Sequence, residues 1–443
     1  MAEDAQRVLP AAGDAFKSRD FRLYQVARLM VIVGAEAQAV AVAWQVYAIT
    51  HSALDLGYTG LALFLPGLFL MLAAGHTADR YDRRKIILAC YGLQMLCTVA
   101  LLGLSLSGET ALRGGRVWPI YVVLLGIGMG RAFSGPAASA MLPSLVPEEH
   151  FVNAVTWSAT VYRTANMTGP AVGGILFTLP LTGALARFNG AAIVYAFTLA
   201  MLAGFIVLVA MIRTPMAPGE RQSFTTKTML AGLEYVWRTR LLLGSISLDL
   251  FAVLLGGATA LLPIFATDIL HSGPQGLGML RAMPSVGALA VSLFMVVKPI
   301  KRRAGWLMLM CVAIFGIATV VFGLSKSLLA SAIALIIVGG SDMVSVVIRG
   351  SMLQLATPPE MRGRVSAVNW LFIGASNEFG EFESGVTAQW WGAVPAVVIG
   401  GIGSIAVTVA AAGLFPTLRR VDTLTADELL EADRELSVAE PVD

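Results

Sequence analysis

The sequence predicts an all-α membrane protein with twelve transmembrane helices in two pseudo-symmetric six-helix bundles. Three observations lead to this fold class. Hydrophobic residues make up 57% of the 443 residues and charged residues only 13%, and the mean hydropathy is +0.75, which is typical of integral membrane proteins. Twelve apolar segments are each long enough to span a bilayer. The second six segments repeat features of the first six.

The apolar segments set the expected spans, because a helix needs about 20 mostly apolar residues to cross the hydrocarbon core. The expected spans are 21–49, 54–75, 85–106, 118–141, 151–178, 190–211, 241–269, 275–297, 305–324, 329–352, 366–391 and 394–415. The first, fifth, seventh and eleventh are long, which favours tilt or ends that project into water. No short apolar segment with a cleavage site precedes the first span, so we expect no cleaved signal peptide.

The polar stretches divide the chain. Between the sixth and seventh spans, five apolar residues stand at helical spacing and predict an amphipathic helix on the membrane surface: Met229, Leu230, Leu233, Val236 and Trp237. We expect the tail from Val421 to be solvated, because it is acidic. The expected parts are a cytoplasmic N-terminal segment (1–20), an N-terminal six-helix bundle (21–211), a cytoplasmic linker with the amphipathic helix (212–240), a C-terminal six-helix bundle (241–415) and a cytoplasmic acidic tail (416–443).

Positive charges predict the orientation of the chain. With the N-terminus inside, the inner segments carry 22 lysines and arginines and the outer segments carry 4. Cytoplasmic segments are enriched in these residues. The asymmetry therefore predicts that both termini are cytoplasmic and that the number of spans is even.

An internal repeat supports the two bundles. A shift of 211 residues superimposes ordered matches between spans four and five and spans ten and eleven. The matches include Met141 on Met352, Pro147 on Pro358, Asn166 on Asn377, Gly169 on Gly380 and Gly174 on Gly385. Internal duplication with a site between the two halves is a transporter architecture, although chance alignment is the alternative explanation.

The segment GHTADRYDRRK (75–85) lies between spans two and three. It resembles the loop signature of the major facilitator superfamily, with Asp82 at the usual turn glycine, where we expect a left-handed conformation. The alternative is an ordinary positively charged loop. Opposite charges on equivalent cytoplasmic surfaces of the two halves predict a gate, in which Asp79 contacts the inner end of span eleven or the Arg362–Arg364 loop when the inside is closed. The residues that fit the signature are Gly75, Ala78, Asp79, Arg80, Arg83 and Arg84.

Two further motifs extend the resemblance. Span four holds GIGMGRAFSGP, with Arg131 near mid-membrane, and it is similar to the Arg-x-x-Gln-Gly signature of the superfamily. Span five holds NMTGPAVGG, which is similar to an antiporter-associated Gly-Pro signature. Its small residues allow close helix approach and its proline allows a kink, so simple packing explains them as well as an antiporter role does. The residues are Gly169, Pro170, Gly173 and Gly174.

Three longer segments point to one branch of the superfamily. RLYQVARLM…VAVAWQVYAIT, LEYVWRTRLLLGSISLDLF and WLFIGASNEFGEFESGVTA resemble the enterobactin-exporter-like, or transmembrane secretion effector, branch. That branch is associated with export of siderophores, drugs and other small molecules. The resemblance covers nearly the whole chain and implies a branch rather than a substrate.

Three glutamates interrupt span eleven in the stretch NEFGEFESG (377–385). An ionised carboxylate at bilayer depth costs several kcal/mol unless it is paired or hydrated. Glu378 and Glu381 are three residues apart and share a helix face, whereas Glu383 lies about 140° away from Glu378. We therefore expect Glu378 and Glu381 to face one neighbour or the cavity, and Glu383 to face a different helix.

The other charges inside the expected spans supply partners and alternatives. Six acids face five arginines (Arg28, Arg131, Arg163, Arg281 and Arg349), so most are expected to pair. Similar depth suggests Arg281 with Glu383. Structural ion pairs are the favoured reading of Glu383, Arg281 and Arg349. The four histidines lie at or outside span ends, so a proton carrier inside the membrane must be a carboxylate. The candidates for proton coupling are Glu378, Glu381, Glu36, Asp249, Asp342 and Arg131.

The motifs present and missing favour a secondary transporter over other classes. No nucleotide-binding G-x-x-x-x-G-K-[ST] motif and no H-E-x-x-H or G-x-S-x-G motif occurs, which argues against a pump or an enzyme. The sequence predicts proton-coupled export of a small amphipathic molecule, with proton-coupled uptake as the alternative. Aromatic residues on the expected cavity helices, Trp44, Tyr47 and Phe251, are candidates to contact the substrate. We expect a monomer in a bacterial inner membrane, with protons and a small molecule as partners and no cofactor, metal or nucleic acid.

Overall fold

Long helices dominate the structure. The computed structural model describes residues 14–107, 116–179, 189–214, 226–300, 302–425 and 428–429, and within these ranges it contains no strand. The first half comprises α1 (Arg19–Thr50), α2 (Ala53–Arg80), α3 (Arg83–Leu106), α5 (Trp118–Met141), α6 (Phe151–Phe177) and α7 (Gly190–Ala210). The second half comprises α9 (Arg240–Gly256), α11 (Gly273–Val297), α12 (Ala304–Leu324), α13 (Leu328–Leu355), α14 (Arg362–Trp391) and α15 (Ala393–Leu414). Eleven of the twelve expected spans each fall on one of these helices, and the seventh, 241–269, begins on α9 and extends past its end.

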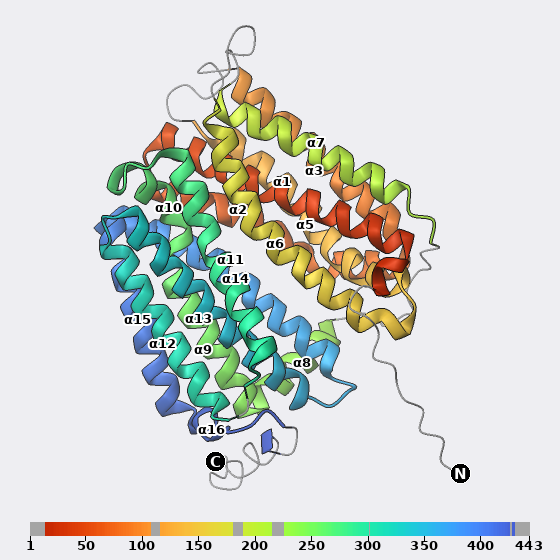
Figure 1. The fold of residues 1–443 in the computed structure, drawn as a ribbon, viewed down its shortest axis with the longest axis vertical. Helices are drawn as coiled ribbons and strands as arrows, with labels where there is room; N and C mark the ends of the chain where they lie inside the picture. Colours follow the sequence, from red (N-terminus) through yellow and green to blue (C-terminus); the bar gives the residue numbers. More distant parts are fainter. Residues whose placement is uncertain are drawn as a thin grey trace.

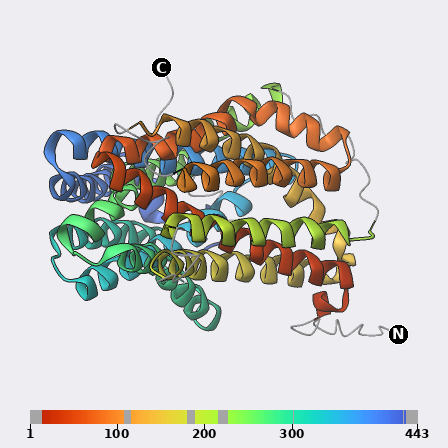
Figure 2. The same cartoon turned by 90° about the horizontal axis from the view of Figure 1, so that it is seen from above.

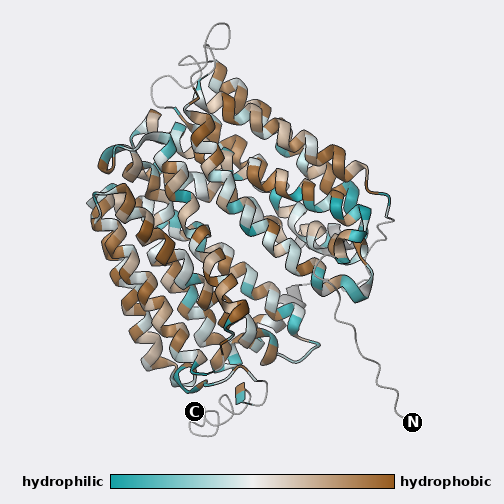
Figure 3. Cartoon of the chain, viewed as in Figure 1, coloured by the Kyte–Doolittle hydropathy of each residue, from teal (hydrophilic) through white to brown (hydrophobic). Residues whose placement is uncertain are grey.

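Ten of the helices in the described ranges are long and apolar enough to cross a membrane. The other two long helices, α6 and α14, are more polar. They nevertheless run beside spanning helices, because α6 packs along α1 and α11, and α14 packs along α2 and α9. That α6 and α14 also cross the membrane remains a prediction, which their packing supports. Hydrophobic residues cover much of the helix length, and hydrophilic residues gather at the helix ends (Figure 3).

The seventh predicted span is interrupted. α9 ends at Gly256, and the segment continues through two short turns, η6 (Ala258–Leu261) and α10 (Leu262–Ile264), and a π-helical turn, η7 (Phe265–Ile269). Gly257, between α9 and η6, has ψ 59°, which departs from helical geometry. The predicted span, 241–269, is confirmed as one long apolar segment, Arg240–Ile269. The helix within it is not continuous, which corrects the expectation of a single regular helix.

The helices form two bundles, α1–α7 and α9–α15 (Figure 1), which stay largely on opposite sides in the turned view (Figure 2). Glycines matched by the 211-residue repeat occupy equivalent contacts in both. A Cβ on Gly174 of α6 would lie 3.0 Å from the Cα of Gly278 in α11, and a Cβ on Gly385 of α14 would lie 3.0 Å from the Cα of Gly57 in α2. Both pairs cross between the bundles, as a pseudo-twofold axis requires. Chance alignment therefore does not explain the repeat.

The two bundles share a hydrophobic core at one end only. The first described residues, 14–17, and the short helix α16 (Pro416–Arg420) lie toward one side of the molecule, here called the terminal side (Figure 1). On the opposite side one hydrophobic core runs through both bundles and includes Val46, Leu56, Phe265 and Leu277. On the terminal side each bundle has its own separate core. If the terminal side is cytoplasmic, as the positive charges predict, this arrangement is inward-facing.

The predicted amphipathic helix exists as α8 (Thr226–Arg238), but part of its apolar face is docked on the second bundle. Val236 is buried in the core of that bundle, and the hydroxyl of Tyr235 donates to the carbonyl oxygen of Ala356 at 2.9 Å. Leu230 and Trp237 remain exposed. The helix therefore belongs to the second bundle and does not rest on the membrane surface alone.

The start of the C-terminal tail is held against the protein, contrary to the expectation that the tail is solvated from Val421. Val421 and Leu429 are buried in the core of the second bundle. Asp422 accepts a hydrogen bond from the backbone N–H of Arg303 at 2.8 Å, just before α12. Apolar side chains spaced among the acids are therefore enough to anchor this segment. Residues 430–443 of the predicted tail lie outside the described residues.

Candidate functional site

Two glutamates of α14 point at the first bundle. A Cβ on Gly60 of α2 would lie 2.8 Å from Oε2 of Glu381 and 3.2 Å from Oε2 of Glu378. Both carboxylates therefore converge on the same small residue, as expected for side chains three apart on one helix face. The absent side chain of Gly60 leaves the space that these carboxylates occupy.

Two arginines lie within electrostatic reach of these acids. The charges of Arg131 on α5 and Arg281 on α11 both act on Glu378, and Arg281 also acts on Glu381. Neither arginine forms an ion pair with these glutamates that is short enough to count as a contact. The acids therefore lie among positive charges without being fixed by them.

An ion pair links the two bundles near these acids. Nε of Arg281 lies 3.9 Å from Oε2 of Glu36 on α1, and both side chains are about a quarter exposed. This geometry is at the limit of an ion pair, so the pair can break at low cost when the bundles move. The sequence suggested Glu383 as the partner of Arg281. That pairing is wrong, because Glu383 lies on another face of α14.

A second ion pair lies wholly inside the second bundle. Arg349 of α13 contacts Asp249 of α9, and the side chains are only 3% and 8% exposed. Two charges taken this far from water must be paired, because an unpaired buried charge costs several kcal/mol. The surroundings therefore favour a structural role for Asp249, which the sequence offered as a coupling candidate.

The break in the seventh span shapes a pocket in the second bundle. Thr259, in the turn η6 after the break, donates a hydrogen bond of 3.4 Å from its hydroxyl to Oε1 of Glu381. Ser384 Oγ donates to the carbonyl oxygen of Gly257 at 3.0 Å, which ties the break to α14. A continuous helix would not present Thr259 and the Gly257 carbonyl in this way. The break therefore joins α9 to the acidic face of α14.

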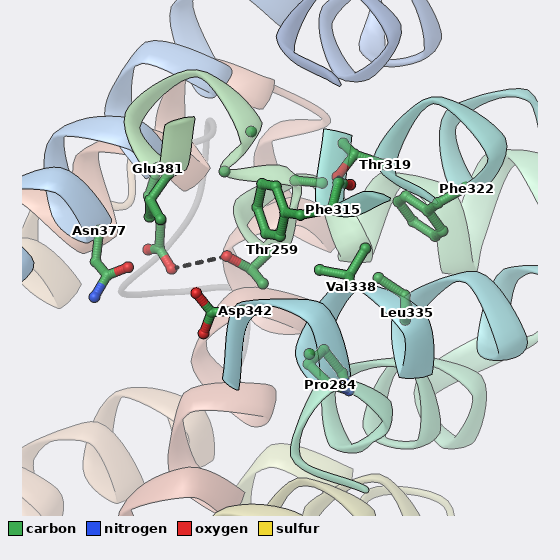
Figure 4. Close-up of a pocket in the computed structure, with 15 residues that line it drawn as sticks. Thr259, Pro284, Phe315, Thr319, Phe322, Leu335, Val338, Asp342, Asn377 and Glu381 are labelled. Atoms are coloured by element: carbon green, nitrogen blue, oxygen red, sulfur yellow. Dashed lines mark hydrogen bonds between the residues drawn. The ribbon is translucent and has the colours of Figure 1, made fainter. Parts of the chain in front are cut away.

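The pocket beside this break has a volume of about 200 Å³ and two kinds of wall. Figure 4 shows Glu381, Asn377, Asp342 and Thr259 on one side. The other side is mostly apolar and is formed by Phe315, Phe322, Leu335, Val338 and Pro284, with Thr319 among them. We call this cavity the C-half pocket. It can receive a molecule that combines an apolar part with a polar group.

The aromatic candidates lie in three different environments. The ring of Trp44 packs against Phe177 with ring centres 6.1 Å apart. The hydroxyl of Tyr47 donates to a carboxylate oxygen of Asp268, which joins the bundles on the side opposite the termini. Phe251 is exposed and lies on the face of α9 opposite Asp249. None of these three residues lines the C-half pocket.

The signature at 75–85 is more helical than the sequence suggested. Gly75 to Arg80 form the last turns of α2, and α3 begins at Arg83. Asp82 has φ −56°, not a left-handed conformation, and its Oδ1 accepts from the backbone N–H of Arg84 at 2.9 Å. Aspartate therefore stands here as a helix cap, which explains why it replaces the usual glycine. The Asp79 side chain lies outside the described part of the structure.

Three basic residues of the proposed gate are bound within their own bundles. Arg84 donates to the carbonyl oxygen of Ala210 at the end of α7. Arg362 donates to the carbonyl oxygen of Thr357 at 3.1 Å, and Arg364 donates to the sulfur of Met361. These contacts suit a conformation in which the terminal side is open and the two gate segments are apart.

The Gly-Pro motif of α6 packs on two neighbours. Gly173 faces α1, where a Cβ would lie 2.7 Å from the Cα of Ala37, and Gly169 faces Val33 on the same helix. Gly174 faces α11, where a Cβ would lie 2.7 Å from the carbonyl oxygen of Pro274. The small residues of the motif therefore allow the backbone of α6 to pack closely against both its own bundle and the other bundle.

Sequence reasoning missed two members of the site. Arg281 was interpreted as structural, yet it lies between Glu36 and the α14 acids. Thr259 was not singled out, because the helix break that positions it was not foreseen. The signal that could have found the break is the pair Gly256–Gly257 followed by Pro263, since glycine and proline weaken helices.

Two pseudo-symmetric bundles that meet at a charged interface define the class of protein, a membrane transporter in which two repeats surround a central site. Comparison with known proteins agrees. A family model described as transmembrane secretion effector matches residues 12–441. The chain is 28% identical over 398 residues to the enterobactin exporter EntS of Escherichia coli O81 (strain ED1a), which covers 88% of this chain and 87% of the relative. EntS of Escherichia coli O139:H28 matches to the same extent.

Solved structures share the fold. A bacterial homolog to the human lysosomal transporter Spinster, inward-facing and unoccupied, has a TM-score of 0.69 at 13% identity, over 94% of this chain and 99% of that chain. A bacterial homologue of the iron transporter ferroportin in the inward-facing state has a TM-score of 0.64 at 12% identity, over 88% and 98%. A D-xylose-proton symporter has a TM-score of 0.65 at 13% identity, over 88% and 96%.

The chain belongs to the transmembrane secretion effector family, a branch of the major facilitator superfamily. It is an integral membrane transporter of small molecules, because the match covers nearly the whole chain and its relatives are transporters. This confirms the prediction of a transporter rather than an enzyme.

Proposed function

We propose that this protein exports a small amphipathic molecule across a bacterial inner membrane in exchange for protons, by alternating access. The similarity to enterobactin exporters over most of the chain favours export. The observation that carries the proton coupling is the pair of carboxylates, Glu378 and Glu381, which converge on Gly60 at the contact between the bundles. Both termini would lie in the cytoplasm, and the conformation described here would be inward-facing.

The physical argument starts from the position of the two acids. Two like charges at bilayer depth cannot both be ionised cheaply, so one carboxyl is expected to hold a proton. Gly60 belongs to the first bundle and the acids to the second, so a rocking motion of the bundles would change the surroundings of both carboxylates. It would also change their distance to Arg281, which Glu36 holds across the same contact. Access of protons to the acids would thus follow the motion that moves the substrate.

The test is proton movement driven by substrate. Inverted membrane vesicles containing the protein are given an inward proton gradient, monitored by quenching of a fluorescent amine, and compounds including catecholate siderophores are added. An exported compound is expected to release protons and restore the fluorescence. Compounds that instead carry protons into right-side-out vesicles, and leave the gradient of inverted vesicles unchanged, would support proton-coupled uptake.

Variants of α14 separate coupling from folding. Glu378→Gln and Glu381→Gln are expected to abolish gradient-driven transport while the purified proteins remain folded. Glu383→Gln is the matched control, since it removes a carboxylate from the same helix but from another face. If both glutamine variants release protons and transport like the parent, these acids do not couple, and Glu36 or Asp342 would be examined next.

The gate at 75–85 remains part of this proposal. Asp79 would contact the Arg362–Arg364 segment when the terminal side closes, because the opposite charges lie at equivalent ends of the two bundles. Asp79→Asn would then slow transport without reducing the amount of folded protein. Unchanged transport kinetics would contradict a gating role.

A further inference from the structure

The proton coupling proposed above uses Glu378 and Glu381 and assigns no role to Asp342 in the C-half pocket. It lies on α13, half-buried, and lines the cavity together with Glu381 of α14. Within the described part of the chain it makes no hydrogen bond and no ion pair. Arg163 and Arg349 act on it only through space, and Arg349 is already paired with Asp249. A half-buried carboxylate without a contact partner, facing a cavity, is expected to serve a ligand.

The charge of the pocket points to a cation. Its charged lining residues, Asp342 and Glu381, are both acidic, and Thr259 and Asn377 add neutral oxygen atoms. Of the lining residues, none is an arginine, lysine or histidine. An anionic ligand would meet two carboxylates in a site of low dielectric, which is strongly unfavourable.

The shape of the pocket points to an organic cation rather than a metal ion. In the described ranges no group of three or more histidine, cysteine, aspartate or glutamate residues is placed to hold a metal. The volume of about 200 Å³ far exceeds that of an ion. Phe315, Phe322 and Leu335 form an apolar wall opposite the acids, which suits a hydrocarbon group, and a phenyl face attracts a cation.

We propose that the C-half pocket binds an organic ammonium group, with its positive nitrogen between Asp342 and Glu381 and its apolar part against Phe315 and Leu335. This rests on the proposed transport function and narrows its substrate class to molecules that carry such a group. Thr259 acts as a positioning residue, because its hydroxyl holds the Glu381 carboxylate at the edge of the pocket.

The experiment measures equilibrium binding without any gradient. Benzyltrimethylammonium is titrated into the purified full-length protein in detergent, by calorimetry, in parallel with neopentylbenzene, its uncharged carbon isostere. We expect saturable binding of the ammonium and at least about tenfold weaker binding of the isostere, because only the cation meets the carboxylates. Equal binding of the two compounds would overturn the proposal without any need for a variant.

Substitutions then locate the site. Asp342→Asn is expected to weaken ammonium binding by about tenfold or more, since it removes one of two carboxylates while keeping the side-chain shape. Glu383→Gln is the matched control and should bind like the parent. Thermal unfolding of each variant checks that it is folded. Unchanged binding by a folded Asp342→Asn, or displacement of the ammonium by sodium at millimolar concentration, would contradict the proposal.

The binding experiment and the transport experiment can fail independently, so each tests one proposal. Ammonium binding by the parent protein, together with proton-driven transport that is intact in both Glu378→Gln and Glu381→Gln, would contradict the coupling proposal only. Proton-driven export by a protein that does not bind the ammonium would contradict only the proposal that the C-half pocket binds an organic ammonium group.

Discussion

Two pockets related by the internal repeat differ in what fills them. One lies in the first bundle and has a volume of about 10 Å³, and the other is the C-half pocket of about 200 Å³. Shifts of 211 and 221 residues superimpose their linings. The matched pairs are Gln38 with Thr259, Gln94 with Phe315, Thr98 with Thr319, Ile127 with Val338 and Arg131 with Asp342.

The difference arises from side-chain length and from the helix break. In the first bundle the hydroxyl of Thr98 donates to Oε1 of Gln38 at 3.0 Å, and the long side chains of Gln38 and Arg131 line the small space that remains. In the second bundle the shorter Thr259 and Asp342 replace Gln38 and Arg131, and α9 ends at Gly256 where α1 continues unbroken. Equivalent backbone positions therefore form a nearly filled pocket with an arginine in the first bundle and an open pocket with two acids in the second bundle.

The largest expected effect concerns the ion pair beside the C-half pocket. Asp249→Asn would leave the Arg349 guanidinium buried without its counter-charge, at a cost of about 3–5 kcal/mol in the free energy of unfolding. We expect a marked loss of folded protein, measured by yield and by thermal unfolding in detergent. Replacing both partners, as in Asp249→Leu with Arg349→Met, should recover much of the stability. A single variant as stable as the parent would show that the pair does not support the pocket.

The second prediction makes the C-half pocket resemble its partner. Gly256→Ala introduces the residue that the repeat places there in the first bundle, Ala35. The added Cβ would lie 2.5 Å from Cε1 of Phe315, which must move into the cavity. We expect a cost of about 1–3 kcal/mol from overpacking, and weaker binding of benzyltrimethylammonium.

The reverse exchange is the control for this prediction. Ala35→Gly in α1 should cost only the helix propensity difference of about 1 kcal/mol and leave ammonium binding unchanged. Thermal unfolding and calorimetry measure both variants. Equal ammonium affinity in Gly256→Ala and the parent would mean that the volume beside Phe315 is not used.

The third prediction asks whether the acids of the second bundle depend on a glycine of the first. Gly60→Ala places a Cβ within 3.2 Å of carboxylate oxygens of Glu378 and Glu381. The bundles would have to separate slightly there, which disfavours the observed conformation by about 1 kcal/mol or more. Gly67→Ala is the matched control on the same helix, because no atom lies within 4 Å of its added Cβ.

The rate of disulfide cross-linking between the two bundles measures the effect expected in this third prediction. Ser52 Oγ and Gln389 Oε1 lie 3.5 Å apart across the two bundles. With both positions changed to cysteine and the three native cysteines replaced, we expect slower cross-linking in Gly60→Ala than in Gly67→Ala. Identical rates would show that the glycine is not needed for the approach of the acids.

The smallest effect is expected for a carboxylate in contact with water. Burial opposes the ionisation of Glu428, but hydrogen bonds from the Thr423 side chain and from the backbone N–H groups of Thr423 and Asp422 lower its pKa below the usual range. A lowered pKa stabilises the folded tail above the usual carboxyl range, and this stability is lost as the pH falls through the lowered value. Solvent screening keeps the contribution at about 1 kcal/mol or less.

Hydrogen exchange measures this effect. The backbone N–H groups of Asp422 and Thr423 donate to Glu428 at 2.7 and 3.0 Å. Their protection, corrected for intrinsic exchange, should be full at pH 7 and decrease at acidic pH, and Glu428→Gln should remove this pH dependence. Protection that does not vary with pH would show that the tail is held by Val421 and Leu429 alone.

The sequence predicted the fold class because the physics of a bilayer acts on composition and segment length. Apolar segments of about 20 residues must become helices when no water can satisfy the backbone. Eleven of the twelve expected spans accordingly coincide with one long helix in the described ranges, and the seventh coincides with α9 and the turns that follow it. The shared face of Glu378 and Glu381 followed from helical spacing alone. Glycine matches within the repeat likewise anticipated equivalent contacts, as Gly174 and Gly385 show.

Partners across space could not be read from the chain in the same way. Depth along the span suggested Glu383 for Arg281, whereas the rotation of each helix about its axis brought Arg281 to Glu36. The local effect of Gly257 was also hidden, because two glycines weaken a helix without deciding whether it breaks.

What the sequence by itself determined about this protein is therefore its membrane class, the number and positions of its long helices, and the face of α14 that carries two acids. Only the tertiary structure decided which charges are paired, where the seventh span breaks and which half contains the open pocket. The physical reason is the distance along the chain over which each interaction acts. Hydrophobic length and helical periodicity act within one segment, whereas the pairing of Asp249 with Arg349 and the exposure of Asp342 to the C-half pocket depend on how several helices pack.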